Sequence, residues 1–488
     1  METPLVKKNL TSESDYLAVK RLKDVKYVIW NETVKIWRIA VPVALCSLFQ
    51  YLNYTSTSIY AGHLGDIELS SVSLYLSVIT SIYYSLLFGM STALATVCGQ
   101  AYGAGQFQNA GIYVQRSWII LLTTCIFLLP IHIYATPILK FLGQEQKIAD
   151  LAGKYAILVI PYMFSYAINL PIKKFLQAQS KVNVIMYIAI MTLLIHNGLL
   201  YIFTHVFDWG IIGLAMASNI TGWVFSVALV IYTIGWCKEG WNGLSWMAFK
   251  DLWEFAKLSI GSSVMICLEQ WYSACIMLLA GHLDNPVIAI GSFSICLNIQ
   301  SWKTMLFLGV STALSVRVSN TLGMSHPRAA KYSFLVTMFE SLLIGIIFMI
   351  VIFLSKNKFA IIFTNSKDII HASSELAYLL GISMVLHSVS QTISGVVTGC
   401  GWQVMVGYIN LACYYIVGLP VGIFLGFHQH LGVKGLWGGT MCGSILQIFV
   451  LIFIICKTNW SKEVENTATR MGIWNSTKLQ KDVIENGV

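Results

Sequence analysis

The chain has 488 residues, of which 56% are hydrophobic and only 11% are charged, and its mean hydropathy is +0.70. Soluble globular domains carry roughly 25% charged residues, so this composition leaves too little polar surface for a water-soluble particle of this size. The formal charge of +9 is spread between apolar runs instead of being gathered on one face, which argues against nucleic acid as a partner. We therefore expect an integral membrane protein.

The first 30 residues contain lysines and one arginine but no apolar core, which predicts a soluble tail and not a cleaved signal peptide. The 11 cysteines are scattered singly, most of them inside apolar runs, and form no C-x-x-C pair. We expect them to be buried apolar residues, with no metal. The glycine-rich segment 99–105 lacks the Gly-Lys-Ser/Thr end of a P-loop, so no ATP and no cofactor are indicated.

Beyond the tail, apolar runs long enough to cross a hydrocarbon core of about 30 Å, roughly 20 residues each, recur along the chain. Barrel strands are shorter and alternate apolar with polar residues, whereas these runs do not alternate. The sequence therefore predicts an all-α polytopic membrane protein. The twelve expected spans are at about 36–60, 69–95, 114–137, 149–171, 183–206, 210–234, 255–280, 286–315, 330–354, 370–394, 404–427 and 433–456.

The distribution of positive charge tests this placement, because cytosolic loops carry an excess of Lys and Arg. An even number of spans puts both termini on one side. That side receives 23 of the 31 Lys and Arg residues, the other side receives seven, and Lys303 lies within a span. The bias predicts cytosolic termini and supports the span count, since a miscounted span would scramble it.

The two halves of the chain resemble each other at a nearly constant offset of 219 to 222 residues. The repeated segments are Ala61–Leu64 with Ala280–Leu283, Gly89–Leu94 with Gly309–Leu314, and Gly210–Leu214 with Gly432–Leu436. Each half holds six predicted spans, so both halves enter the membrane from the same side as parallel repeats. Two such bundles enclose a central cavity that can open to either side, which favours a transporter over a channel or a membrane enzyme.

The repeat also predicts the domain organisation. The expected divisions are a cytosolic tail at 1–32, a first lobe at 33–236, a cytosolic linker at 237–254, a second lobe at 255–456 and a cytosolic tail at 457–488.

Four short segments and the C-terminal tail resemble signature segments of a known family. They are Gly99–Gly103, Phe175–Gln179, Arg317–Asn320, Gly399–Gln403 and, in the tail, Lys457–Trp460 with Glu463–Asn466. Together they look like the multidrug and toxic compound extrusion (MATE) family, and more narrowly its plant DETOXIFICATION members. The resemblance implies twelve transmembrane helices in two pseudo-symmetric six-helix lobes, the MATE fold. It also implies export of organic solutes in exchange for protons, and the branch it resembles most carries flavonoid glycosides or related phenolics into the vacuole.

Ionisable residues deep in a span cost about 2.5–3.5 kcal/mol to insert and mark functional positions. Glu269 lies about 17 Å from the outer end of its span at 1.5 Å per residue. Plant members of the family have a carboxylate in this place. A carboxyl group removed from water holds a proton more readily, so we expect Glu269 to carry the coupling proton. The alternative is a structural carboxylate satisfied by its neighbours.

Lys303 lies about 26 Å from the outer end of the next span, so two extended side chains would bridge it to Glu269. One hypothesis is that they form such a pair; in the alternative, Lys303 lines a wet cavity or snorkels without touching Glu269. Many plant members carry an acid near the position of His387, so the histidine puts a two-carboxylate mechanism in doubt. Histidine still titrates near pH ~6.5 and can relay a proton, although a lone intramembrane histidine is more often structural. Glu340 is a weaker candidate for coupling.

The first span contains no mid-span carboxylate, and among the polar cavity candidates of the first half only His196 can change its charge. We therefore expect coupling in the second half. The expected substrate-cavity residues are Gln50, Asn53, Tyr54, His196, Asn197, Tyr272, Trp302 and Tyr414. The aromatic members have the chemistry to stack on a planar ligand, although packing and anchoring at the membrane interface are the commoner roles of Trp and Tyr.

The predicted function is secondary active export of an organic solute from the cytosol, in exchange for protons, by alternating access. The solute is a flavonoid glycoside or another phenolic or alkaloid metabolite. The alternatives are sodium-coupled or uncoupled transport of organic cations or other xenobiotics. A membrane enzyme would need acidic or histidine clusters at a membrane surface, and none is found. We expect a monomer in the lipid bilayer and favour the vacuolar membrane over the plasma membrane, which has the same topology.

Overall fold

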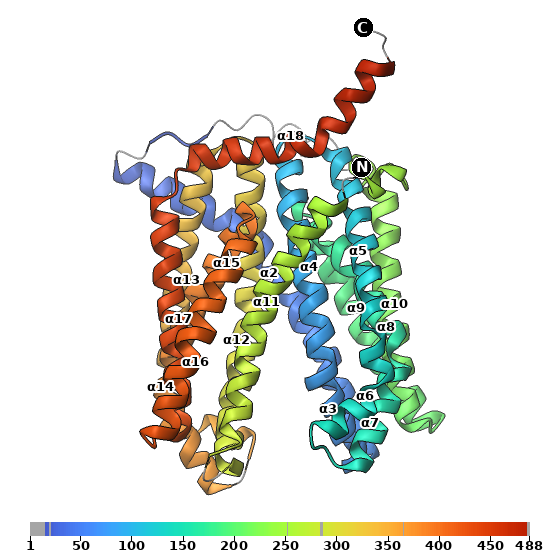
Figure 1. Ribbon diagram of the computed structural model, residues 1–488, viewed down its shortest axis with the longest axis vertical. Coiled ribbons are helices and arrows are strands. Elements are labelled where there is room, and N and C mark those ends of the chain that lie inside the picture. The colour runs from blue at the N-terminus through green and yellow to red at the C-terminus, as the bar shows by residue number, and fades with distance from the viewer. Residues whose placement is uncertain (1–14, 19–20, 251, 284–285, 365, 486–488) are drawn as a thin grey trace. The chain divides into compact units, whose positions relative to one another are not determined.

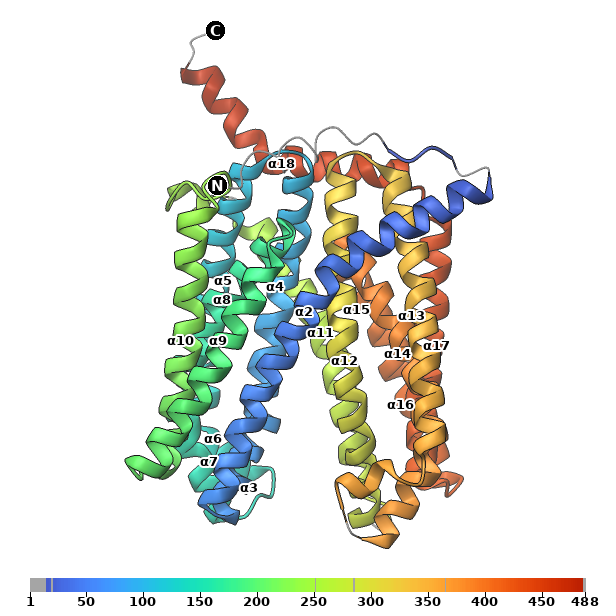
Figure 2. The same cartoon turned by 180° about the vertical axis from the view of Figure 1, so that it is seen from behind.

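The computed structural model describes residues 15–18, 21–250, 252–283, 286–364 and 366–485 (Figures 1 and 2). The described residues form helices and connecting turns, with no strand. The helices of the first half are α2 (Leu22–Leu64), α3 (Asp66–Leu74), α4 (Thr80–Gly103), α5 (Phe107–Ile133), α6 (Ala135–Phe141), α7 (Gln146–Leu158), α8 (Ile160–Ala178), α9 (Val182–Tyr201) and α10 (Gly210–Trp236). Those of the second half are α11 (Leu252–Ala280), α12 (Pro286–Gly323), α13 (Pro327–Ser355), α14 (Lys367–Cys400), α15 (Gln403–Asn410), α16 (Leu419–Ile423), α17 (Gly432–Lys457) and α18 (Trp460–Glu485).

Short non-α turns interrupt or connect these helices. Four are π-helical, at Tyr75–Ile79, Ile202–Val206, Leu411–Gly418 and Phe424–His428, and two are 3₁₀ turns, at Trp246–Phe249 and Phe359–Ile362. The turns at Tyr75–Ile79 and Leu411–Gly418 join consecutive helices into single spans, whereas the other two extend the ends of α9 and α16. Such turns are rare in proteins and occur frequently at functional sites.

Each of the twelve predicted spans coincides with a helix or with a run of joined helices. Within the described residues, ten of these are long and apolar enough to cross a membrane, and the pair α7 and α8, bent by 49°, makes an eleventh. The remaining span lies in α2, which has 43 residues and so far exceeds the roughly 20 that a crossing needs. The prediction of an all-α polytopic membrane protein is confirmed.

The chain forms two compact units. We call Leu45–Tyr102 with Gln106–Ser263 the N-unit, and Met1–Ala44 with Gly103–Gly105 and Val264–Val488 the C-unit. The division falls inside α2 and α11, so the first helix of each sequence half begins in one unit and ends in the other.

The two halves repeat their backbone conformation where the sequence repeats. Where α10 begins, Asp208 and Gly210 have positive φ angles of 52° and 53°, and where α17 begins, His430 and Gly432 have 53° and 56°. Left-handed φ is costly for residues other than glycine, so two such pairs at the same place in each half are a shared structural feature and not chance. This agreement confirms the two pseudo-symmetric six-helix halves.

The beginning of α2 is anchored inside the C-unit by a buried carboxylate. Glu32 is fully buried and accepts two hydrogen bonds from the Arg317 guanidinium, at 2.8 and 3.0 Å. The hydroxyl groups of Tyr16 and Ser333 also donate to Glu32, at 2.7 and 2.8 Å. The carboxylate thus ties α2 to both α12 and α13.

Two further features lie in the C-unit near this anchor. Glu340 accepts hydrogen bonds from Thr33 and from Nε1 of Trp37, the latter at 3.0 Å, which gives this carboxylate structural partners. Helix α18, in the region expected to be a tail, packs against α12 and α13. Its Arg470 donates to the carbonyl oxygen of Cys400 at the end of α14, at 3.0 Å.

Candidate functional site

Glu269 lies in a polar cluster between helices of the C-unit. Its Oε1 accepts a hydrogen bond from Nε2 of Gln391, on α14, at 3.4 Å. In the described part of the chain no cation forms an ion pair with this carboxylate. Glu269 is therefore a half-buried acid whose hydrogen-bond neighbour is a neutral amide.

A chain of neutral polar groups continues from α14 to α17. The hydroxyl of Tyr414 donates to Oε1 of Gln447 at 2.7 Å, and Ser390 donates to the same oxygen at 3.4 Å. Nε2 of Gln447 donates to Oδ1 of Asn410 at 2.7 Å. Tyr414 lies in the π-helical turn Leu411–Gly418, whose local widening changes the direction of the side chains that follow.

The tyrosines predicted to line a cavity in the C-unit are packed against each other. Tyr272 and Tyr414 stack at a centroid distance of 4.9 Å with ring planes 9° apart, and both are buried. The Tyr272 hydroxyl donates to the carbonyl oxygen of Gly439 at 3.4 Å. Trp302, in contrast, is 49% exposed and its ring lies 5.8 Å from that of Phe363. The structure thus brings Tyr272 and Tyr414 together and leaves Trp302 apart from that stack.

The predicted ion pair between Lys303 and Glu269 is wrong. Nζ of Lys303 donates to the backbone carbonyl of Met384 at 2.7 Å and lies 5.0 Å from the centre of the Phe307 ring. Depth along two helices makes the pair plausible, but the two side chains meet α14 at different points, Lys303 at Met384 and Glu269 at Gln391. The lysine is 2% exposed, so its ammonium group is held by a carbonyl oxygen and an aromatic face.

His387 lies on α14 one turn beyond Met384, and its Nδ1 is buried without a hydrogen-bond partner in the described residues. The ammonium group of Lys303 acts on it electrostatically. The two residues proposed from sequence as accessory to coupling are therefore neighbours. Their part in coupling stays a prediction.

The N-unit contains a small cavity of about 60 Å³. Four of the predicted cavity residues line it, namely Gln50, Asn53, Tyr54 and His196. The fifth, Asn197, lies outside the lining and donates to the carbonyl oxygen of Leu193 at 2.9 Å. A volume of this size holds a few water molecules but no organic solute of the expected class.

His196 bridges two threonines at this cavity. Its Nε2 lies 2.9 Å from the hydroxyl of Thr57, and its Nδ1 lies 3.1 Å from that of Thr221. Each hydroxyl is also within hydrogen-bond distance of a carbonyl oxygen on its own helix, that of Asn53 at 3.1 Å and that of Ala217 at 2.7 Å. A hydroxyl has one proton and a neutral imidazole has one N–H, so a neutral ring requires one threonine to give up its helix bond.

Sequence reasoning missed part of both clusters. In the C-unit it missed Gln391, Asn410 and Gln447, and in the N-unit it missed the tyrosines that line the cavity, which are Tyr75, Tyr83, Tyr155, Tyr162 and Tyr166. An available signal was that amide side chains are rare inside apolar spans. The recurrence of tyrosine in the second and fourth spans was another.

Comparison with known proteins assigns these features to a class of membrane protein. The family model MatE matches residues 42–202 and 262–424, one block in each half of the chain. The structure superposes on the crystal structure of the eukaryotic MATE transporter AtDTX14 with a TM-score of 0.87, at 31% identity, covering 91% of this chain and 99% of that one. The chain belongs to the MATE family and is a multi-pass integral membrane transporter of organic compounds.

Its similarity to individual relatives extends over nearly the whole chain. Protein DETOXIFICATION 35 of Arabidopsis thaliana is 52% identical over 99% of this chain and 99% of its own length. Protein DETOXIFICATION 34 of the same plant is 51% identical over 96% of this chain and 87% of its own length. A Vibrio cholerae MATE transporter, VcmN in the bent form, shares the fold at a TM-score of 0.77 with 16% identity, covering 92% of this chain and 99% of that one.

Proposed function

We propose that this transporter exports an organic solute from the cytosol in exchange for protons, by alternating access, with Glu269 as the coupling residue. The solute is a flavonoid glycoside or another phenolic or alkaloid metabolite. The observation that carries the proposal is the environment of Glu269, whose hydrogen-bond partner is the neutral amide of Gln391 and which has no cation paired with it in the described residues.

A carboxylate of this kind gains a proton without breaking an ion pair. The ionised group only accepts hydrogen bonds, whereas the protonated group also donates one. Protonation therefore changes the hydrogen bond between Glu269 and Gln391. Gln391 lies on α14 and Glu269 on α11, so proton uptake changes a bond between two helices. A local change of charge that biases a two-state element is the general form of such switches.

We propose Lys303 and His387, which lie in the same unit as Glu269, as accessory residues of proton coupling. The residues proposed to contact the substrate are Gln50, Asn53, Tyr54, His196 and Asn197 in the N-unit and Tyr272, Trp302 and Tyr414 in the C-unit. We further propose that both termini are cytosolic, that the transporter acts as a monomer, and that it resides in the vacuolar membrane. The charge bias of the loops supports the orientation.

The test is uptake by proteoliposomes of a flavonoid glycoside and of a tetraalkylammonium ion, each with a proton gradient, a sodium gradient or no gradient. We expect accumulation of the glycoside that requires the proton gradient. The Glu269→Gln variant should lose this accumulation while keeping its thermal stability. Glu340→Gln is the matched control in the same unit, because Glu340 already has Thr33 and Trp37 as partners. Accumulation driven only by sodium would support sodium-coupled transport instead, and transport independent of any gradient would support an uncoupled transporter.

A further inference from the structure

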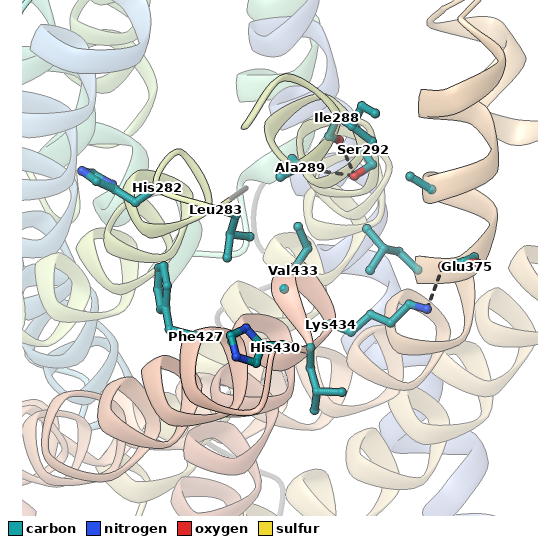
Figure 3. A pocket seen from close by; sticks show the side chains of 15 residues that line it. His282, Leu283, Ile288, Ala289, Ser292, Glu375, Phe427, His430, Val433 and Lys434 are labelled. Carbon is teal, nitrogen blue, oxygen red and sulfur yellow. Dashed lines mark hydrogen bonds and ion pairs between the residues drawn. The ribbon is translucent and has the colours of Figure 1, made fainter. Parts of the chain in front are cut away.

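Exposed lysines of this chain pair with carboxylates in each of the two units. In the C-unit, at a pocket of about 510 Å³, Nζ of Lys434 lies 2.7 Å from the Glu375 carboxylate, which the dashed line in Figure 3 marks. In the N-unit, Nζ of Lys140 lies 2.7 Å from Oδ1 of Asp150. Two other lysines of the N-unit differ from these in both burial and partners.

These two are Lys173 and Lys174, and they lie inside α8 and not in the loop expected after the fourth span. Lys174 is only 6% exposed, and Lys173 is half-buried. Nζ of Lys173 donates to Oε1 of Gln50 at 3.1 Å and lies 6.0 Å from the centre of the Phe225 ring. Nζ of Lys174 lies 5.1 Å from the centre of the Phe88 ring. All of these partners are neutral.

The positive charge of this pair has no counter-charge among the described residues. No carboxylate there forms an ion pair with either lysine, and Lys174 donates no hydrogen bond to a described group. The charged side chain that acts on Lys174 is Lys173, which has the same sign. The chain neighbours of both lysines, and of the side chains that they contact, are all described. A buried cation without a counter-charge costs free energy, and inside a membrane protein it marks a functional position.

A row of half-buried aromatic rings begins beside Lys174. The rings of Phe88 and Tyr84, on α4, stack at 5.6 Å with planes 17° apart. Tyr84 in turn meets Tyr166 of α8 edge to face at 5.5 Å. Aromatic rings arranged in this way offer faces and edges to another planar ring. Seven residues, about 10 Å of helix, separate Tyr166 from Lys173 along α8.

We propose that Lys173 and Lys174 bind the acidic group of the transported solute while its aromatic ring lies on Tyr84 and Phe88. The solute is then an aromatic organic anion, such as a phenolic glycoside that carries a carboxylate on its sugar. Ammonium groups with neutral partners gain charge-assisted hydrogen bonds from a carboxylate, and these are roughly twice as strong as neutral ones. A distance of about 10 Å between ring and charge leaves room for one sugar unit.

This inference rests on the proposed export of an organic solute and adds the charge of that solute. Equilibrium binding tests it without a proton gradient, so the Glu269→Gln variant should bind the anion as the unmodified protein does. Loss of proton coupling with the anion preference retained would contradict the coupling proposal alone. Loss of the anion preference with coupling retained would contradict this inference alone.

The test measures binding of two fluorescent probes, 4-methylumbelliferyl glucuronide and 4-methylumbelliferyl glucoside, to the full chain in phosphatidylcholine nanodiscs at neutral pH. The probes share the coumarin ring, and only the sugar of the glucuronide carries a carboxylate. We expect the glucuronide to bind about tenfold tighter or more, the lower end of what a hydrogen bond to a charged group contributes. Sodium acetate at equal concentration should not displace it. Displacement by acetate would assign the lysines to small free anions instead.

Variants then locate the site. The double variant Lys173→Met with Lys174→Met should bind the glucuronide only as tightly as the glucoside, with the glucoside unchanged. Lys174→Arg keeps the charge and should keep the preference, as should Lys238→Met, which removes an exposed lysine from the same unit. Lys174→Met should melt no lower than the unmodified protein, whereas replacing a lysine that a carboxylate neutralises costs stability. Equal affinities for the two probes, a preference that survives in the double variant, or a lower melting temperature of Lys174→Met would overturn the proposal.

Discussion

At the residue scale, Lys303 shows that the depth of a side chain along its helix does not predict its partner, because the direction of the side chain also matters. Counting residues along a helix estimates how deep a side chain lies, and on that basis Lys303 and Glu269 were within reach. The direction in which a side chain leaves its helix depends on packing, and α12 packs closely on α14. Lys303 therefore reaches the carbonyl oxygen of Met384 and not the carboxylate.

The Lys303→Met variant tests this assignment. A cation within about 4–6 Å of a carboxylate would move the pH midpoint of transport by about 1–3 units. Because Lys303 binds Met384 instead, we expect the midpoint to stay where it is, with a loss of about 1 kcal/mol of stability from the missing hydrogen bond. Transport measured against pH and thermal melts in detergent give the two quantities. A shifted midpoint would restore the direct pair.

A second residue, Glu32, precedes the first predicted span and has a defined protonation state. Burial by itself raises the pKa of Glu32, but hydrogen bonds from Arg317 and the positive charge of that residue outweigh burial and hold the pKa below the ordinary value of 4.5. A carboxyl group whose pKa is lowered in the folded state stabilises that state above its unfolded pKa. The contribution is lost as the pH falls through the lowered folded value.

Glu32→Gln removes the carboxylate that the Arg317 guanidinium binds, and breaking a buried pair in this way costs about 3–5 kcal/mol. We expect a large fall in melting temperature at neutral pH. As the pH falls below 4.5, the ordinary pKa of a glutamate, the unmodified protein should lose stability through protonation of Glu32. The variant should not show this pH-dependent loss. Adding Arg317→Gln should recover part of the loss. A variant that melts with the unmodified protein at neutral pH would show that the pair contributes little.

At the element scale, the repeated glycines explain why the two halves pack alike. A Cβ atom at Gly89, on α4, would lie 2.5 Å from the Cα atom of Ser263 in α11. A Cβ atom at Gly309, on α12, would lie 2.4 Å from the carbonyl oxygen of Ala40 in α2. In each half the glycine allows its helix to approach the backbone of a first helix. Small residues serve this purpose in membrane bundles, where close packing replaces the hydrophobic drive of water.

The Gly309→Ala variant should lose about 1–3 kcal/mol of stability, because a carbonyl oxygen must move to admit the methyl group. The matched control is Gly198→Ala in α9, where an added Cβ meets no atom within 4 Å. There alanine should be neutral or stabilising by up to about 1 kcal/mol, since it favours helix over glycine. Fluorescence-detected thermal melts of both variants measure the difference. Equal melting temperatures would contradict the close approach at Gly309.

At the scale of the whole molecule, topology follows from the helices and the loop charges together. Twelve spans put both termini on one side, and the excess of Lys and Arg on that side predicts that it is cytosolic. A split fluorescent protein tests the prediction, with its short fragment fused at either terminus or inserted at 356–358 and its large fragment in the cytosol. The two terminal fusions should fluoresce and the insertion should not. The reverse pattern would invert the orientation.

The sequence by itself determined the number of spans, the parallel repeat and the family, because hydropathy, loop charge and short motifs are read along one dimension. It also singled out Glu269, since a carboxylate inside an apolar run is conspicuous. Only the tertiary structure decided which groups meet. The rotation of each helix about its axis sets the contacts of Gln391 with Glu269 and of Met384 with Lys303, and it places the tyrosines around His196. The sequence does not predict this rotation, because a membrane span is apolar both where it faces lipid and where it faces its neighbours.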